Sequence, residues 1–188
     1  DMLYLVMEFI DGNALHQSIA GGTVEPIQAL QIIEGVAQGL GEAHHNHLLH
    51  RDIKPASIMI THELKPVLGD FGLTLGTSDT DAGGNPVSSG YLAPETLEDG
   101  TASSPASDVY SLGIIMHELV TGIKPQPGAA ADLDRVPNFK GLRELVEKVV
   151  HRDPSQRPRD GGDFAIILER WLKSASQTRP PLLTGAGP

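Results

Sequence analysis

A short polar cluster stands directly in front of an apolar run in the stretch HRDIKPASIMI, residues 50–60. It carries a carboxylate at Asp52, a cation at Lys54 and a hydroxyl at Ser57, and a second carboxylate, Asp70, follows a little further on. Phosphoryl transfer needs groups of these types: one carboxylate to orient the attacking hydroxyl and accept its proton, a cation to neutralise the transferred group, and another carboxylate to hold Mg²⁺. The cluster therefore indicates phosphoryl-transfer chemistry.

The elements that must position this cluster follow from the spacing of apolar residues. Residues 3–9 form an apolar run that predicts a buried strand. A helix is predicted behind it, with Thr23 as its cap, Pro26 in its first turn and its end near His45. The polar cluster then follows the end of this helix.

The rest of the chain predicts a hairpin, a loop and several helices. Ile58 to Ile60 and Lys65 to Leu68 predict the two strands of the hairpin, and residues 72–90, rich in Gly, Ser, Thr and Asp, predict a long loop that is functional or disordered. Three apolar stripes at helical spacing then predict helices packed in an ordinary core. The stripes consist of Val109, Leu112, Met116, Leu119 and Val120, of Leu142, Leu145, Val146 and Val149, and of Phe164, Ile167, Leu168, Trp171 and Leu172. The fold class is mainly α with small β hairpins (α+β).

Composition narrows the class of function. The chain has 188 residues, of which 39% are hydrophobic and 20% charged, as in globular proteins. Its net charge of −10 argues against binding to nucleic acid, which needs clustered basic residues. Cysteine is absent, so disulfides and thiolate metal sites are excluded. No apolar run approaches the ~20 residues of a membrane span, and no leader is visible.

The two ends of the chain differ in character. The chain opens on an apolar run without a starting Met, so we expect it to be cut from a longer protein. The other end is rich in Pro and Gly and lacks periodicity, which predicts a linker or tail. The expected division is a partial domain over residues 1–173 and a linker or tail over residues 174–188.

Several short motifs occur in an order along the chain that resembles one known family. HRDIKPAS is similar to the catalytic loop of protein kinases, DFG at residues 70–72 to their Mg²⁺-binding turn, and APE at residues 93–95 to the end of their activation segment. DVYSLG at residues 108–113 resembles their central helix, and RDPSQRP their late arginine loop. Over Leu3 to Leu172 the chain thus resembles the hinge and C-terminal lobe of a eukaryotic-type (Hanks-type) protein serine/threonine kinase of bacterial type. The implied fold is protein-kinase-like, with the C-lobe only and the N-lobe missing.

The resemblance implies a role for each matching residue of the catalytic loop and its neighbours. Asp52 would be the catalytic base, Lys54 would contact the γ-phosphate, and Asp70 with Ser57 would bind the metal. The remaining implied residues form two groups, an ATP-binding set and a structural set. The ATP-binding set consists of Met7 as gatekeeper, Glu8 and Ile10 in the hinge, and Met59 under the adenine. The structural set consists of His50, Phe71, Asp108, and Glu95 paired with Arg157.

The resemblance also implies regulation. Arg51, directly before the catalytic Asp, indicates control by phosphorylation of the activation loop, because Arg pairs with phosphate bidentately. The expected regulatory hydroxyls are Thr74, Thr77, Ser78, Thr80 and Ser88, the last of which would also contact the catalytic loop. Four histidines at residues 44, 45, 47 and 50 could suggest a metal site, but we interpret them as helix-end and structural histidines.

The chain departs from the family at four places. Ser57 stands where the family has Asn, and it predicts attenuated binding of the second Mg²⁺, because a hydroxyl is shorter than an amide and lacks its NH₂ donor. No glycine-rich loop, strand Lys or partner Glu of an N-lobe is found. Val87 replaces a Gly before Ser88, and residues 126–138 leave room for only a short turn where a docking helix is usual.

The leading hypothesis is a protein serine/threonine kinase that transfers the ATP γ-phosphate to Ser or Thr hydroxyls of proteins. The expected cofactors are ATP and Mg²⁺, with Mn²⁺ as a substitute, and the expected partners are protein substrates and the missing N-lobe of its own parent chain. A cytoplasmic location is expected, either free or as the cytosolic part of a membrane receptor kinase. The alternative is a pseudokinase that acts as a scaffold or allosteric module, and a small-molecule kinase of similar fold is a distant third. Activity of this segment alone is not expected to be efficient.

Overall fold

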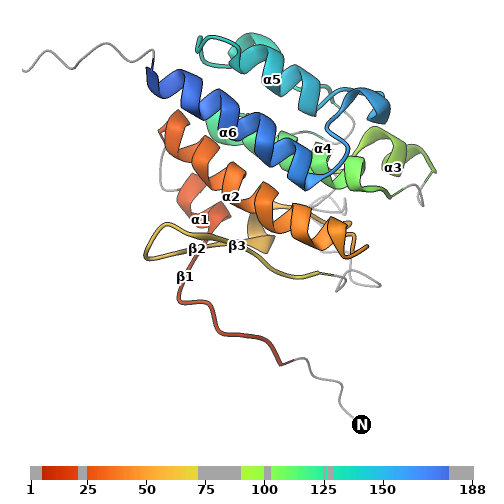
Figure 1. Cartoon of the computed structure of the whole chain (residues 1–188). Coiled ribbons are helices and arrows are strands. Elements are labelled where there is room, and N and C mark those ends of the chain that lie inside the picture. Colours follow the sequence, from red (N-terminus) through yellow and green to blue (C-terminus); the bar gives the residue numbers. More distant parts are fainter. Residues whose placement is uncertain are drawn as a thin grey trace, which may run out of the picture.

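A helical body with a small sheet at one side forms the fold in a computed structural model, which describes residues 6–20, 25–71, 90–99, 103–124, 126 and 129–177 (Figure 1). The sheet has three antiparallel strands in the order β1 (Gly12–Ala14), β2 (Ile58–Thr61) and β3 (Pro66–Leu68). Met59 of the central strand pairs with Ala14 on one side and Val67 on the other. The predicted hairpin is therefore confirmed, and the sheet adds a strand that the sequence did not indicate.

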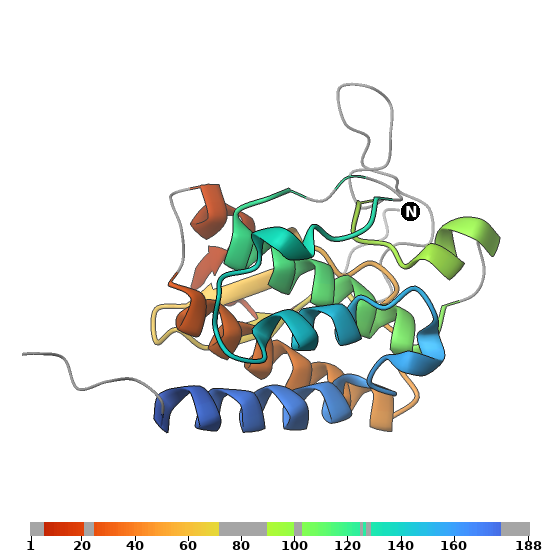
Figure 2. The ribbon, with the colours of Figure 1, turned by 90° about the horizontal axis from the view of Figure 1, so that it is seen from above.

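Six α-helices and three short 3-10 helices make up the rest of the described fold. Their bounds are α1 Leu15–Ala20, α2 Pro26–His45, η1 Pro55–Ser57, α3 Pro94–Asp99, α4 Pro105–Thr121, η3 Leu133–Arg135, α5 Leu142–Val149, η4 Pro154–Gln156 and α6 Gly161–Gln177. α2, α4 and α6 lie side by side, and α5 packs on α4 (Figure 2). The four longest predicted helices and the α+β class are thus confirmed.

Helix α4 is the centre of the body, and its sequence explains both ends. Ser104 and Ser107 form a capping box, in which each side chain accepts from the other's backbone N–H, and Pro105 occupies the first turn. Gly122 ends the helix in the left-handed conformation at φ 72°. Every residue from Ser107 to Val120 is buried, so this helix is covered on all sides. It therefore carries Asp108, in its first turn, into the interior.

Helices α2 and α6 approach closely because glycines face each other where they cross. A methyl group at Gly161 would lie 2.5 Å from the Gly41 nitrogen and 2.8 Å from the Ala37 carbonyl oxygen. This contact brings the start of α6 against the last turns of α2, next to His44. The close approach therefore fixes the end of α2, from which the loop with Asp52 and Lys54 departs.

The predicted strand over residues 3–9 is wrong for the part that the structure describes. Residues 6–10 have no regular structure, and the exposed fractions of Val6 and Phe9 are 82% and 88%. The first strand begins only at Gly12, where the chain meets Thr61 of β2. An apolar run needs a partner strand to be buried, and no described residue of the chain pairs with residues 6–10.

Other predicted boundaries shift by a few residues. The N-cap of α2 is Glu25, whose side chain makes no capping bond, and Thr23 lies outside the described residues. Helix α6 continues to Gln177, beyond the expected start of the tail at residue 174. The added turn is supported by packing, because Ala175 contacts the core and the Ser174 hydroxyl donates to the Trp171 carbonyl. Among described residues, none of the helices is long and apolar enough to cross a lipid bilayer.

Candidate active site

Asp52 and Lys54 form an ion pair on the loop between α2 and η1. The Lys54 ammonium lies 2.8 Å from the Asp52 Oδ2, and their side chains are 20% and 9% exposed. Partial burial strengthens such a pair relative to one in bulk water. The pair places a proton acceptor and a cation side by side, which are two of the groups that phosphoryl transfer requires.

The Asp108 carboxylate accepts hydrogen bonds from the backbone of this loop. Its Oδ2 accepts from the His50 backbone N–H at 2.8 Å, and its Oδ1 accepts from the Arg51 backbone N–H at 2.8 Å. Arg51 has a φ of 71°, in the left-handed region that costs energy for a side-chain-bearing residue. Two charge-assisted bonds from a carboxylate that is 2% exposed offset that cost. The loop conformation thus depends on Asp108.

His44 is a third donor to the same carboxylate, and its contacts define its tautomer. Its Nε2 lies 3.0 Å from the Asp108 Oδ2, and its Nδ1 accepts from the Gly161 backbone N–H at 3.1 Å. Because Nδ1 is an acceptor, Nε2 carries the proton and donates to Asp108. One buried ring therefore joins α2, α4 and the start of α6 beneath the catalytic loop.

His50 joins the catalytic loop to the turn that carries Asp70. Its Nδ1 accepts from the Asp52 backbone N–H at 3.3 Å, and its Nε2 donates to the Gly69 carbonyl at 2.7 Å. The His50 ring also lies 4.7 Å from the ring of Phe71, measured between centroids. These contacts bring His50 and Phe71 together, as the resemblance implies for the stacked framework.

Asp70 is the carboxylate that fits a metal ion. It is exposed and has a φ of 60°, a conformation that Asp tolerates better than most residues. An accessible carboxylate oxygen is the donor type that Mg²⁺ prefers, since Mg²⁺ keeps several waters and takes one or two carboxylates. Among described residues, His, Asp and Glu side chains form no cluster of three or more that could hold a metal by themselves.

Glu95 and Arg157 form a buried, two-pronged ion pair behind the site. The Arg157 guanidinium donates to both Glu95 oxygens, at 2.7 and 2.9 Å, and its side chain is fully buried. It also stacks over the Tyr110 ring, with the guanidinium carbon 4.7 Å from the ring centroid. Burial raises the pKa of Glu95, but hydrogen bonds from Arg157 and Ser107 outweigh it and hold the pKa below its ordinary value. The expected Glu95–Arg157 contact is therefore present.

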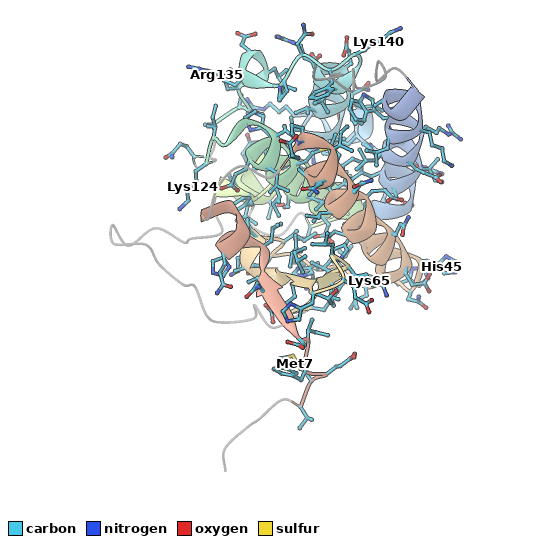
Figure 3. All side chains as sticks on the ribbon, turned by 90° about the vertical axis from the view of Figure 1, so that its left-hand side faces the viewer. Met7, His45, Lys65, Lys124, Arg135 and Lys140 are labelled. Carbon is cyan, nitrogen blue, oxygen red and sulfur yellow. The ribbon has the colours of Figure 1, made fainter. Side chains whose placement is uncertain are left out.

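The expected adenine-binding residues are not all brought to this site. Met7 and Glu8 lie on the extended residues 6–10, away from the helical body, and the exposed fraction of Met7 is 62% (Figure 3). Ile10 belongs to the same segment, whereas Met59 is half-buried in the central strand β2. The expected regulatory hydroxyls lie outside the described residues: Thr74, Thr77, Ser78, Thr80 and Ser88.

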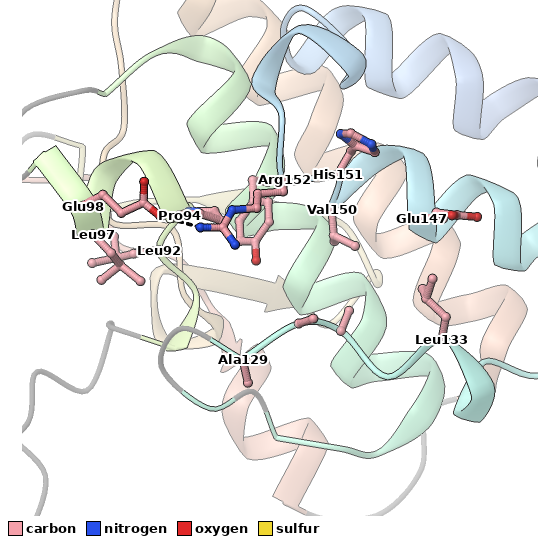
Figure 4. A pocket seen from close by; sticks show the side chains of 13 residues that line it. Leu92, Pro94, Leu97, Glu98, Ala129, Leu133, Glu147, Val150, His151 and Arg152 are labelled. Atoms are coloured by element: carbon pink, nitrogen blue, oxygen red, sulfur yellow. Dashed lines mark hydrogen bonds and ion pairs between the residues drawn. The ribbon is translucent and has the colours of Figure 1, made fainter.

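A pocket of about 330 Å³ lies elsewhere, between α3, α4 and α5 (Figure 4). Leu97, Leu133 and Val150 line it, with Glu98 and Arg152 paired at 2.7 Å on its rim. Residues 129–133 cover its lower side. Among the described residues of 126–138 the helical element is the short η3, Leu133–Arg135, which agrees with the short turn expected there. The pocket contains neither Asp52 nor Asp70, so it is separate from the candidate active site.

Sequence reasoning missed a buried pair on the far side of α4. The Tyr91 hydroxyl donates to the Glu118 Oε2 at 2.8 Å, and both residues are 6% exposed. Burial raises the pKa of Glu118, although the Tyr91 bond and the nearby Lys124 ammonium oppose the shift. Burial and then the Glu118 charge also raise the pKa of Tyr91. The available signal was an ionisable residue, Glu118, directly before the apolar residues Leu119 and Val120.

The fold and these contacts resemble those of a protein kinase, and comparison with known proteins identifies the family of the chain. The protein kinase domain family matches residues 1–181, so the chain belongs to the protein kinase family. Members of this family use ATP and Mg²⁺.

Individual relatives are bacterial serine/threonine-protein kinases. The chain is 40% identical over 135 residues to PrkC of Bacillus subtilis, which covers 70% of this chain and 21% of the relative. It is 35% identical to PknL and 34% identical to PknA of Mycobacterium tuberculosis, covering 88% and 95% of this chain. The chain spans about half the length of these two relatives, at 47% and 46%.

A solved structure supports the same fold. The kinase domain of Mycobacterium tuberculosis PknI matches with a TM-score of 0.71 and 25% identity, over 88% of this chain and 64% of that chain. The prediction of a Hanks-type bacterial kinase fold is thereby confirmed.

Proposed function

We propose that the chain is the catalytic part of a protein serine/threonine kinase that transfers the ATP γ-phosphate to Ser and Thr hydroxyls. The observation that carries the proposal is the Asp52–Lys54 pair at 2.8 Å on a loop whose backbone Asp108 holds by two hydrogen bonds. Positioning of this kind supplies much of the catalysis of phosphoryl transfer. The names of the bacterial relatives agree with this reaction.

Each residue of the site has a separate proposed role. Asp52 orients the acceptor hydroxyl and takes its proton, and Lys54 neutralises charge on the transferred phosphoryl group. Asp70 would hold a Mg²⁺ ion, which supplies charge neutralisation for the nucleotide phosphates. Arg51, exposed at the loop surface, is available to pair with a phosphorylated activation-loop residue such as Thr74 or Thr77.

The nucleotide needs further groups that the described residues do not bring together. Val6, Met7 and Phe9 present apolar side chains to solvent at exposed fractions of 62% or more. We infer that a partner surface, the N-lobe of the parent chain, covers them and places Met7, Glu8 and Ile10 against the adenine with Met59 beneath it. A cytoplasmic location, either free or on the inner side of a membrane receptor, fits the ATP requirement.

The test is transfer of labelled γ-phosphate from ATP to a generic basic protein, with the 188-residue chain and with the full-length gene product. Asp52→Asn should lower incorporation by at least about 100-fold, since a positioned general base contributes about that much. Glu169→Gln, an exposed change on α6, serves as the matched control and should leave the rate unchanged. Label on Ser or Thr supports the proposal. Incorporation by the full-length product at the Asp52→Asn background would overturn it.

A pseudokinase scaffold is the second candidate, and Ser57 in place of the family's Asn is the observation that favours it. The same assay separates the two, because a scaffold would fold and bind partners without transferring label. The retained Asp52, Lys54 and Asp70 favour the enzyme.

A further inference from the structure

The backbone of Ser57 is hydrogen-bonded on both sides within the catalytic loop and its neighbouring turn. It is the last residue of η1 and is 2% exposed. Its backbone N–H donates to the Lys54 carbonyl at 2.9 Å, and its carbonyl accepts from the Gly69 N–H at 2.9 Å. Ser57 therefore connects the segment that bears Asp52 and Lys54 with the turn that bears Asp70.

The hydroxyl of Ser57 is directed at Asp52. Its Oγ lies 3.3 Å from the Asp52 carbonyl oxygen, and because a carbonyl cannot donate, the single hydroxyl proton is used there. At 3.3 Å the bond is long for an O–H donor. It is nevertheless buried, and a buried hydroxyl left without a partner would carry a desolvation cost.

A second metal ion fits this position poorly. Mg²⁺ demands nearly octahedral coordination at about 2.1 Å and retains several waters, so its protein ligands need an accessible face. Asp70 has such a face, since it is exposed, whereas Ser57 is 2% exposed. An Asn can donate through its NH₂ group and coordinate through its carbonyl oxygen at the same time, but a serine has one oxygen for both tasks.

We propose that Ser57 is a positioning residue for Asp52 and that the site takes one divalent cation, at Asp70. The hydroxyl holds the Asp52 carbonyl while Lys54 holds its carboxylate at 2.8 Å, so the catalytic base is fixed from both ends. This proposal is an alternative to the expectation that Ser57 acts as an attenuated metal ligand. The proposal rests on the proposed kinase function for its rate effect, but its cation count does not.

The first test counts Mn²⁺ ions by electron paramagnetic resonance, in the 188-residue chain and in the full-length gene product, each with a non-hydrolysable ATP analogue. Wild type and Ser57→Ala should each bind one ion in the site with the same affinity within about twofold, and Ser57→Asn should gain a second. Ser111→Ala is the matched control, because Ser111 is a 5% exposed serine whose hydroxyl also donates to a backbone carbonyl, in α4. Loss of an ion in Ser57→Ala, or two ions in the wild type, would overturn the proposal.

The second test separates positioning from a merely structural role. In the full-length gene product, Ser57→Ala should lower kcat by about 10-fold or more while KM for ATP and the Mg²⁺ concentration for half-maximal rate stay unchanged, since small misplacements of a catalytic group are costly. Amide hydrogen exchange at residues 51–54 should accelerate in Ser57→Ala and not in Ser111→Ala. A raised Mg²⁺ requirement in Ser57→Ala, with exchange unchanged, would assign Ser57 to the metal instead. If the wild type transfers no phosphate, the kinase proposal fails, while the Mn²⁺ count and exchange still decide the role of Ser57.

Discussion

The framework carboxylates Asp108 and Glu95 and the proposed reacting carboxylates Asp52 and Asp70 differ in how completely their oxygens are bonded. Asp108 accepts from two backbone N–H groups and from His44, and Glu95 accepts from both arms of Arg157. Asp70, in contrast, is exposed, and Asp52 has one ion pair, to Lys54. Satisfied carboxylates stabilise the fold, and the more open ones are the ones for which we propose contacts with substrate and metal. Changes in the first group should therefore cost stability, and changes in the second should cost activity.

The largest loss of stability is expected for Arg157→Met. Arg157 donates to Glu95 and to the carbonyls of His151, Arg152 and Ala106, and Met preserves much of its volume without any donor. Leaving a largely buried carboxylate unpaired costs about 3–5 kcal/mol. Chemical denaturation should show a loss of this size. Glu169→Ala, which breaks an exposed pair with Lys173, should change the free energy of unfolding by less than about 0.5 kcal/mol. A similar effect in both variants would contradict the assignment of Arg157 to the framework.

A smaller loss is expected for Asp108→Asn. The amide is nearly isosteric but can accept through one oxygen only, so one of the backbone N–H groups of His50 and Arg51 loses its partner. One unsatisfied buried donor costs about 1–3 kcal/mol. The activity of the full-length gene product should also fall, because the loop at Arg51 relaxes. Denaturation and kinase assays check this together, and unchanged exchange of the His50 and Arg51 amides would refute it.

A pH effect comes from the missed Tyr91–Glu118 pair. The folded protein binds the Glu118 proton more tightly than the unfolded chain does, because burial raises its pKa in the folded state. The free energy of unfolding therefore rises as the pH falls from the raised pKa towards the ordinary value of about 4.3. Glu118→Gln keeps an acceptor for Tyr91 and should remove this slope, as measured by urea denaturation at a series of pH values.

Glu95 should contribute a pH dependence of the free energy of unfolding that is opposite in sign to that of Glu118. Its pKa is held below the ordinary value, so its contribution to stability is present above that value and is lost as the pH falls through its lowered pKa. Glu95→Gln should therefore reduce the acid sensitivity below about pH 4.3, and should not alter the slope above it. If both substitutions acted in the same pH interval, the contrast between the two carboxylates would be wrong.

The order of motifs was enough to predict the fold class and the framework contacts. HRD, DFG, APE and the Asp108 helix each occur as short local patterns, and their partners follow from the family. The exposure of the first apolar run could not be predicted, because a strand is stabilised by a partner and residues 6–10 have none among the described residues. The direction of the Ser57 hydroxyl and the Tyr91–Glu118 pair could not be predicted either. The Tyr91–Glu118 pair depends on packing between segments 27 residues apart, and the Ser57 bond depends on the folded shape of the loop from Asp52 to Ser57, neither of which local spacing encodes.

The smallest effect on stability is expected at Asp70. Asp70→Asn should change the free energy of unfolding by no more than about 0.5 kcal/mol, because the residue is exposed and Asn tolerates its φ of 60° as Asp does. Asp70→Ala should cost about 1 kcal/mol more, since alanine is strained in that conformation. Mn²⁺ should no longer bind to Asp70→Asn in resonance titrations, and phosphoryl transfer by the full-length gene product should fall by at least about 100-fold. Normal Mn²⁺ binding by a stable Asp70→Asn would remove Asp70 from the reacting carboxylates, whereas a loss of several kcal/mol would move it into the framework.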